Sequence, residues 1–340
     1  MGDCQWNIVR RLSRLMRDDM AIIKEFPYES ALVTGGSGFV GSHVCDALVQ
    51  AGVRTISVDD YIAGKSENLL QLRDYDNFSE ISCDITDMDA LGGLVKDIDV
   101  IFHQAASKKT VCLRDPRRDL LVNGGGTFNL LELARDRGVK KFVHASTGSV
   151  YGEAIYSPQD ENHPVAPTSY YGVSKLAGES YVNAFNKLYD LDTTILRYFH
   201  VYGPRQEDVE FGGVVAIFMR KILEGLPLLI FGDGTQERSF TNVSDVVEAN
   251  LLSACIPEAS GKIYNCASGI SVTVRELAEQ VAAIAGVADA KIEYGDWTPG
   301  DIRKFNIDNS KICADLGMEF EKEFTQGLEK TWEWFKGRAN

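Results

Sequence analysis

Short apolar runs alternate with helical stretches along most of this chain, and this alternation restricts the possible fold more than any other feature. Strands are predicted at 31–34, 53–58, 100–103, 141–145 and 193–198, with helices at 40–50, 87–95, 118–137 and 170–189. A strand, a helix and another strand in succession form a βαβ unit, whose two strands are parallel. We therefore expect an α/β protein with a doubly wound parallel sheet and helices on both faces.

The pattern changes at both ends of this region. Residues 1–28 place four arginines among apolar residues at helical spacing, which predicts a helical extension packed on the body or on a partner subunit. After about Tyr202 the pattern becomes irregular, with a helix predicted at 272–285. We expect three parts: the extension at 1–28, a sheet domain at 29–200, and a smaller α/β lobe at 201–340. Some segments of the lobe are expected to return to the sheet domain.

Composition narrows the possible functions. The net charge of −14 makes nucleic acid a poor partner, because phosphate binding needs a basic surface. No run of 18 apolar residues and no secretory signal is present, so we expect a cytoplasmic protein without stable membrane association. Seven scattered cysteines without a Cys-x-x-Cys pair predict reduced thiols, and neither they nor the five histidines have metal-ligand spacing. We expect no metal.

A glycine-rich turn follows the first predicted strand and opens a helix. Its glycines, Gly35, Gly38 and Gly41, are spaced Gly-x-x-Gly-x-x-Gly, which suits a tight turn, close approach to a pyrophosphate and close helix packing. The helix N-terminus adds unpaired N–H groups and a positive dipole end. Asp59 closes the second strand, where a carboxylate accepts hydrogen bonds from an adenosine ribose and repels a 2′-phosphate. The sequence predicts a Rossmann-like domain that binds NAD.

A phenol and an ammonium group lie at i and i+4 on one predicted helix. Tyr171 and Lys175 have this spacing, and the lysine is expected to lower the pKa of the phenol so that it serves as a base near neutral pH. Tyr61 and Lys65 have the same spacing, but they lie in a glycine-containing loop. Context therefore favours Tyr171 and Lys175 as the catalytic pair.

Hydroxyl groups follow the strand predicted at 141–145. Ser146, Thr147 and Ser149 lie just beyond its carboxyl end, where ligands bind in open parallel sheets. A hydroxyl there can hydrogen-bond a reacting oxygen, and it can equally form a helix cap or a turn bond. Composition alone does not choose between these roles.

Together these segments resemble the nucleotide-sugar epimerase/dehydratase branch of the extended short-chain dehydrogenase/reductase superfamily. The resemblance covers about residues 30–335 and is closest to the sugar 4-epimerases. It is carried by TGGSGFVGSH (34–43), VDDYIAGKSENL (58–69), CDI (83–85), HQAAS (103–107), VNGGGT (122–127), STGSVYG (146–152), YYGVSK (170–175), RYFHVYGPR (197–205) and GDGTQERSFTNVSD (232–245).

The resemblance implies a set of residues that bind NAD. They are Gly35, Gly38, Phe39, Val40, Gly41, Asp59, Asp60, Ala63, Gly64, Asp84, Ile85, Gln104, Ala105, Ala106, Lys108, Asn123, Tyr171, Lys175 and Phe199.

The resemblance also implies the chemistry and the substrate. Thr147, Tyr171 and Lys175 carry catalysis on a nucleotide-diphosphate sugar of the UDP-hexose type, which is bound by Thr147, His200, Val214, Arg238 and Asp301. Tyr171 takes the proton of the sugar 4-hydroxyl while hydride passes to NAD, and the resulting 4-keto sugar rotates before hydride returns to its other face. A homodimer through the helices near 118–137 and 170–189 is the family expectation.

Several positions depart from the pattern of related groups. The 4,6-dehydratases carry two acids after the threonine, where this chain has Gly148 and Ser149, and related decarboxylases keep a glutamate at the second of these positions. Both activities are therefore disfavoured. This chain departs from the pattern of galactose-type epimerases at His200, Gly213 and Thr298. Arg303 is a candidate phosphate ligand in place of the residue at 298. Phe305 is a hint against an N-acetyl sugar.

Alternatives to the 4-epimerase remain open. Another reaction on a similar substrate would make the chain a 2-epimerase, a decarboxylase or a keto-sugar reductase. A non-catalytic NAD-binding regulator on the same fold is a third possibility, although such proteins commonly lose the tyrosine or the lysine that this chain keeps. The sequence does not specify the nucleotide or the sugar.

Overall fold

The computed structural model describes residues 26–107, 109–209, 212–287, 289–297, 303, 306–321 and 323–339. Most of the predicted N-terminal extension, residues 1–25, therefore lies outside the described residues. Phe26 and Tyr28 pack against the core of the sheet domain. The Tyr28 hydroxyl donates a hydrogen bond to the Ala254 carbonyl oxygen at 3.1 Å, so the chain enters the sheet domain beside the helix that contains Ala254.

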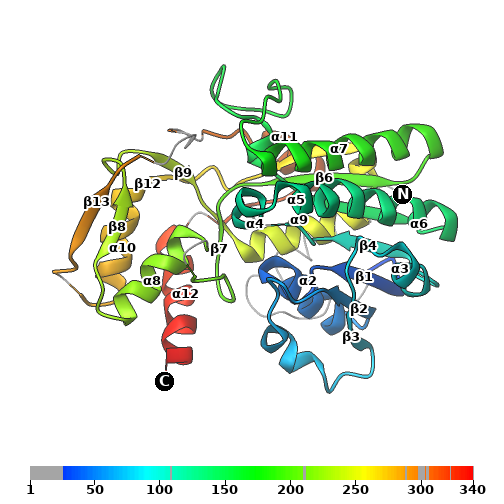
Figure 1. Ribbon diagram of the computed structural model, residues 1–340, viewed down its shortest axis with the longest axis horizontal. Coiled ribbons are helices and arrows are strands. Elements are labelled where there is room, and N and C mark those ends of the chain that lie inside the picture. The colour runs from blue at the N-terminus through cyan, green and yellow to red at the C-terminus, as the bar shows by residue number, and fades with distance from the viewer. Residues whose placement is uncertain are drawn as a thin grey trace.

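Seven parallel strands form the central sheet, in the order β11-β6-β5-β4-β1-β2-β3 (Figure 1). They are β1 (Ser30–Thr34), β2 (Arg54–Asp59), β3 (Phe78–Ser82), β4 (Val100–His103), β5 (Lys141–Thr147), β6 (Thr193–Tyr198) and β11 (Lys262–Cys266). The strand order reverses between β1 and β4, and ligands of doubly wound sheets bind at such a switch point. The predicted α/β class with a Rossmann-like sheet is confirmed.

Two of the seven strands were not predicted. β3 is largely half-exposed and has only Phe78 and Ile81 as apolar residues, so it lacks the apolar run that marks a buried strand. β11 comes from the C-terminal part of the chain and pairs with β6 at the edge of the sheet. Its position depends on long-range pairing that a local pattern does not reveal.

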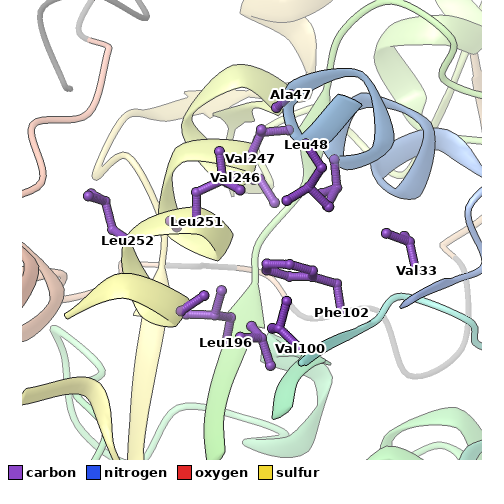
Figure 2. Close-up of a cluster of buried hydrophobic side chains, with 14 of the residues drawn as sticks. Val33, Ala47, Leu48, Val100, Phe102, Leu196, Val246, Val247, Leu251 and Leu252 are labelled. Atoms are coloured by element: carbon purple, nitrogen blue, oxygen red, sulfur yellow. The ribbon is translucent and has the colours of Figure 1, made fainter. Parts of the chain in front are cut away.

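Helices cover both faces of the sheet because side chains along each strand alternate in direction. Leu48 of α2 (Phe39–Gln50) and Val246 of α9 (Val243–Cys255) pack on Val33 and Phe102, with α11 (Ser310–Leu316) on the same face (Figure 2). The other face carries Leu32, α3 (Met88–Leu94), α6 (Thr127–Arg137) and α7 (Tyr170–Tyr189). Both apolar faces of the sheet are thereby removed from water.

The long helix predicted at 118–137 is divided into three pieces. They are α5 (Pro116–Leu120), a π-helical turn η2 (Leu121–Gly126) and α6, preceded by α4 (Lys109–Arg114). Gly124, Gly125 and Gly126 are poor helix formers, and π turns often occur where a helix meets a functional site. The turn contacts α7, which carries the predicted catalytic pair.

The remaining segments form a smaller lobe beside the sheet (Figure 1). Its helices are α8 (Val214–Leu223), α10 (Val274–Ile284) and α12 (Phe324–Ala339). Its short strands are β7 (Val201–Tyr202), β8 (Leu228–Phe231), β9 (Glu237–Ser239), β10 (Thr241–Asn242), β12 (Ser271–Thr273) and β13 (Ile292–Gly295). Phe218, Leu277 and Leu328 lie in its separate hydrophobic core. The intervening α9 and β11 belong to the sheet domain.

Local signals fix the ends of α10. Thr273 and Glu276 form a reciprocal capping box at its start, which satisfies N–H groups that the helix itself leaves unpaired.

Short 3-10 turns occur at η1 (Ser66–Leu72), η3 (Gly148–Val150) and η4 (Pro257–Ala259). Within the described ranges, no helix has the length and apolarity to cross a membrane.

Candidate active site

A cavity of about 430 Å³ opens where the parallel strands end, between the sheet and the lobe. Its lining brings together most of the residues predicted to bind NAD. These are Gly35, Gly38, Phe39, Val40, Gly41, Asp59, Asp60, Ala63, Gly64, Ile85, Gln104, Ala105, Ala106, Tyr171 and Lys175.

The glycine-rich turn has the close approaches that exclude larger residues. Gly35 adopts a φ of +67°, and a Cβ there would lie 2.6 Å from the backbone nitrogen of Ala105. A Cβ on Gly41 would lie 2.1 Å from the carbonyl oxygen of Gly35. Gly38 caps α2 without a side-chain hydrogen bond, so the helix terminus keeps N–H groups available for an anion. This cradle fits the pyrophosphate of a dinucleotide.

Asp59 lies at the end of β2 on the cavity wall and is 7% exposed. Its carboxylate accepts hydrogen bonds from the backbone N–H of Ser37 at 3.0 Å and of Tyr61 at 2.9 Å. A Cβ on Gly64 would lie 2.6 Å from this carboxylate, so the loop approaches Asp59 closely only with glycine there. Tyr61 has a φ of +58° and is not helical, unlike Tyr171.

Asp84 lies outside the lining, although its neighbour Ile85 is part of it. Its carboxylate accepts hydrogen bonds from Thr86 and forms an ion pair with Arg118 at 2.7 Å. Burial opposes its ionisation, but the bonds from Thr86 and Arg118 hold the pKa of Asp84 below its ordinary value. Arg118 also forms an ion pair with Asp60 at 3.3 Å. Arg118 therefore links Asp84 to Asp60, which lines the cavity.

Tyr171 and Lys175 also line the cavity, and Thr147 directly follows Ser146 of the lining. Thr147 ends β5, while Tyr171 lies in the first turn of α7, whose N-cap Ser169 accepts a hydrogen bond from the Gly172 N–H at 3.1 Å. Thr147 Oγ1 donates to Ser149 Oγ and accepts the Ser149 N–H, both at 3.2 Å, and Thr147 lies close enough to the Tyr171 phenol to lower its pKa. Lys175 follows one helical turn later and is 2% exposed. The phenol and the ammonium group thus share one helix, which packs beside the strand that ends in Thr147.

The pKa values of the pair differ from the expectation. Burial raises the pKa of Tyr171 to about 12, the Asp119 charge adds to this, and the hydrogen bond from Thr147 opposes it. Lys175 is not among the groups that shift the pKa of Tyr171, so the expected lowering by Lys175 is not seen. Burial also lowers the pKa of Lys175 to about 8, against the opposing charges of Glu179 and Asp119. The fold therefore favours a neutral phenol at Tyr171 and, one helical turn later, an ammonium group that loses its proton more readily than usual.

Asn123 and Phe199 lie behind the cavity wall and not in it. Asn123 is buried in η2, accepts the Ser107 N–H at 2.8 Å, and donates to Asp119 and Ser174 at 3.0 Å. It therefore positions the 104–107 loop against α7. Phe199 is buried against Gly148, where a Cβ would lie 2.2 Å from the Phe199 ring.

The predicted substrate residues are more dispersed. His200 has a φ of +33° and packs edge-on against Phe240, with ring centroids 5.9 Å apart. Val214 begins α8, one residue after Gly213 of the lining. Arg238 is buried in β9, where its guanidinium donates to the Glu237 carbonyl oxygen at 2.9 Å. Lys108 and Asp301 lie outside the described residues.

Several lining residues were missed by the sequence interpretation. They are Val58, Cys83, Val122, Ala145, Tyr198, Val201, Gln206, Glu207 and Gly212, whereas Ser146 and Gly213, which the sequence analysis singled out, and Ser107 of the HQAAS motif also line the cavity. Ser146 donates to Glu179 at 2.5 Å, and Glu179 forms a buried ion pair with Arg197 at 2.7 Å. Gln206 and Glu207 follow the YGPR segment directly, but only the folded chain brings that segment over the cavity.

The fold and the cavity define a Rossmann-type dinucleotide-binding protein with a Tyr-x-x-x-Lys pair on a helix at the end of its parallel strands. Its described residues contain no group of three or more side chains able to hold a metal ion. The chain belongs to the NAD dependent epimerase/dehydratase family, whose profile matches residues 31–267.

Individual relatives extend over nearly the whole chain. The UDP-glucose 4-epimerase of Mycolicibacterium smegmatis is 39% identical over 91% of this chain and 99% of its own length. The structure of UDP-glucose 4-epimerase from Thermotoga maritima with UDP-glucose matches with a TM-score of 0.86 and 37% identity, over 92% of this chain and 100% of that one.

A third relative was solved with the cofactor. The structure of the UDP-glucose 4-epimerase from Thermus thermophilus in complex with NAD has a TM-score of 0.82 and 34% identity, over 91% of this chain and 99% of that one. Relatives at 30–33% identity include enzymes named as 4,6-dehydratases and decarboxylases of nucleotide sugars.

Proposed function

We propose that this protein is an NAD-dependent nucleotide-sugar 4-epimerase of the UDP-hexose type. The observation that carries the proposal is that Tyr171 and Lys175, one helical turn apart on α7, line the same cavity as the glycine cradle. The relatives named as UDP-glucose 4-epimerases support it.

The side chains have distinct roles in this proposal. NAD, when bound, supplies the hydride acceptor and a positively charged ring. Tyr171 takes the proton from the sugar 4-hydroxyl as the C4–H bond breaks, and gives the same proton back when hydride returns to the opposite face of the 4-keto sugar. Thr147 orients the reacting oxygen and Lys175 stabilises the phenolate. The net change in NAD is zero.

The remaining site residues are assigned by the same proposal. We assign Arg238 to the sugar-nucleotide phosphates, and His200, Val214 and Asp301 to the substrate wall. In this proposal, NAD binds to residues 29–200 together with the returning α9 and β11. The substrate binds to the rest of 201–340.

A 4,6-dehydratase or decarboxylase activity is disfavoured on chemical and steric grounds. The positions after Thr147 are Gly148 and Ser149, so no carboxyl group is present there to take or deliver a proton. In addition, Phe199 occupies the space into which a side chain at position 148 would project. The 2-epimerase, keto-sugar reductase and NAD-binding regulator alternatives are outcomes of the experiment below.

The purified holoenzyme, incubated with UDP-, GDP-, CDP- and dTDP-sugars and followed by NMR, tests the proposal. We expect conversion between C4 epimers of a UDP-hexose without net change in NADH absorbance. Inversion at C2 would indicate a 2-epimerase, and stoichiometric consumption of NADH a reductase. Loss of carbon dioxide would indicate a decarboxylase, and no turnover of any sugar a regulator.

Two variants make the test specific to the site. Tyr171→Phe is expected to lower turnover at least 1,000-fold, since the proton acceptor is lost. Tyr61→Phe is the matched control, because Tyr61 begins the other Tyr-x-x-x-Lys segment and lies in a loop. It should keep near-parent turnover. Equal activity of the two variants would refute the assignment of Tyr171.

We further propose a cytoplasmic homodimer. Exposed apolar side chains gather on the adjoining helices α4, α5, η2 and α7. They are Leu113, Leu120, Leu121, Tyr170, Val173 and Tyr181. A second copy packed on these helices would remove them from water. No disulfide links the six cysteines in the described part of the chain, which is compatible with a reducing compartment.

A further inference from the structure

The segment between β7 and α8 contributes one wall of the NAD cavity. Gln206 and Glu207 line the cavity from this segment, and Phe39 and Val40 of α2 line it from the sheet domain. The segment therefore borders the same space as the helix terminus that would receive the pyrophosphate. Its position depends on what holds it there.

Two contacts fasten this segment to α2. The guanidinium Nη1 of Arg205 lies 2.7 Å from Oδ2 of Asp46, and the two side chains are only 16% and 7% exposed. Gln71 donates to the other carboxylate oxygen of Asp46 at 2.7 Å. His43 donates from Nε2 to the Pro204 carbonyl oxygen at 2.9 Å, since a carbonyl can only accept.

The backbone at Arg205 is held in an unfavourable conformation. Its φ is +66°, in the left-handed region that residues other than glycine rarely adopt. Such residues persist where their surroundings determine them, and they concentrate at ligand clamps. Here the partner is Asp46, on the third turn of the helix whose first turn forms part of the cradle.

The next residue presents an unsatisfied acceptor. The Gln206 amide nitrogen donates to the Val201 carbonyl oxygen at 2.5 Å, whereas its Oε1 is buried and has no hydrogen-bond partner among the described residues. A Cβ on Gly213 would lie 2.2 Å from the Gln206 amide, so the glycine provides the space for it. A buried acceptor of this kind is unfavourable unless a donor reaches it.

We propose that Asp46, Arg205 and His43 are positioning residues that clamp the 203–207 segment onto α2 and thereby set the residence time of bound NAD. The clamp touches no reacting atom. It keeps Gln206 and Glu207 over the cavity, so that NAD leaves only when the segment separates from α2. The inference uses the NAD binding of the proposed function but not the identity of the sugar.

The test measures NAD release from the preloaded holoenzyme after dilution, in the absence of sugar. Asp46→Asn and Arg205→Gln are each expected to release NAD at least 10-fold faster. In the double variant the release rate should not rise further, because the two residues act through one contact. Arg73→Gln is the matched control: it breaks the Arg73–Glu80 ion pair of the same domain, away from the cavity, and should leave release unchanged.

Stability is separated from clamping by thermal melting of each variant with excess NAD. A variant that melts lower but releases NAD at the parent rate would overturn the proposal, as would equal acceleration by Arg73→Gln. If the charged variants do not fold, His43→Leu removes one neutral hydrogen bond and should still accelerate NAD release. His43→Gln retains an amide donor and should release NAD at the parent rate. Parent rates in His43→Leu would overturn the clamp. Failure of the epimerase assay leaves all of these rates measurable.

Discussion

The Phe199 ring lies directly against the Cα of Gly148, so that a Cβ at position 148 would be 2.2 Å from its Cε1 atom. Phe199 is buried and stacks with Tyr151 at a centroid distance of 6.3 Å. The ring therefore has little freedom to move away. The glycine after Thr147 is required by Phe199, the aromatic residue that directly follows the neighbouring strand β6, in addition to any chemical reason for lacking an acid.

Gly148→Ala should destabilise the protein by about 1–3 kcal/mol, because a methyl group is forced into a packed ring. Combining it with Phe199→Leu should recover part of this loss, so the two changes are not additive. Urea unfolding of the single and double variants measures the free energy of unfolding of each, and hence the coupling between the two changes. Additive effects would contradict the steric coupling.

Lys175→Met should increase stability at pH 7 while abolishing turnover. Burial lowers the pKa of Lys175 from 10.5 to about 8, so below about pH 8 the folded state carries the full cost of a buried ammonium group. This shift in the pKa of Lys175 corresponds to at most roughly 3 kcal/mol in the free energy of unfolding. Between pH 8 and 10.5 the folded state has lost this proton and the unfolded state has kept it, so the parent gains stability from this group as pH rises.

The difference between the variant and its parent should therefore shrink from pH 7 to pH 10, as measured by denaturant unfolding. Lys140→Met is a suitable control, since Lys140 is exposed and paired with Asp99 at 2.8 Å. Lys140→Met should not be more stable than the parent protein at pH 7. A Lys175→Met protein less stable than its parent at pH 7 would contradict the burial argument.

Asp59→Asn should weaken the preference for NAD over NADP at least 10-fold. The amide keeps one acceptor oxygen, for either the Ser37 or the Tyr61 N–H, and turns its NH2 group toward the other. The charge that repels a 2′-phosphate is lost. Binding of both cofactors, followed by fluorescence, measures the ratio. Asp60→Asn is the control, because Asp60 lines the same cavity but is paired with Arg118; an equal change in both variants would count against Asp59.

Leu120→Glu should convert a dimer to a monomer in solution. Leu120 is 54% exposed on α5, and a carboxylate in an apolar interface between copies is costly. Leu226→Glu, at a side chain 49% exposed in the lobe, should leave the mass unchanged. Light scattering distinguishes the two, and a parent protein that is monomeric would refute the dimer proposal.

Much of the sheet domain was accessible from sequence because its signals are local. Gly35, Gly38 and Gly41 follow a strand directly, and Tyr171 and Lys175 share a helix whose bounds were predicted correctly. Strand β3 was missed because one of its faces is solvated, and the predicted helix at 118–137 was interrupted by η2 at three glycines. Local patterns report burial along a segment, and they do not report which distant segments pair.

The sequence by itself determined the parallel α/β class, the dinucleotide turn and the residue types for proton transfer, since each depends on spacing within one or two adjacent elements. Only the tertiary structure decided that burial raises the pKa of Tyr171 in place of the expected lowering, and that Asn123 and Asp84 lie outside the cavity. It also decided that Arg205 meets Asp46, 159 residues earlier in the chain. Desolvation and ion pairing depend on surroundings assembled from the whole chain, and those exist only once it has folded.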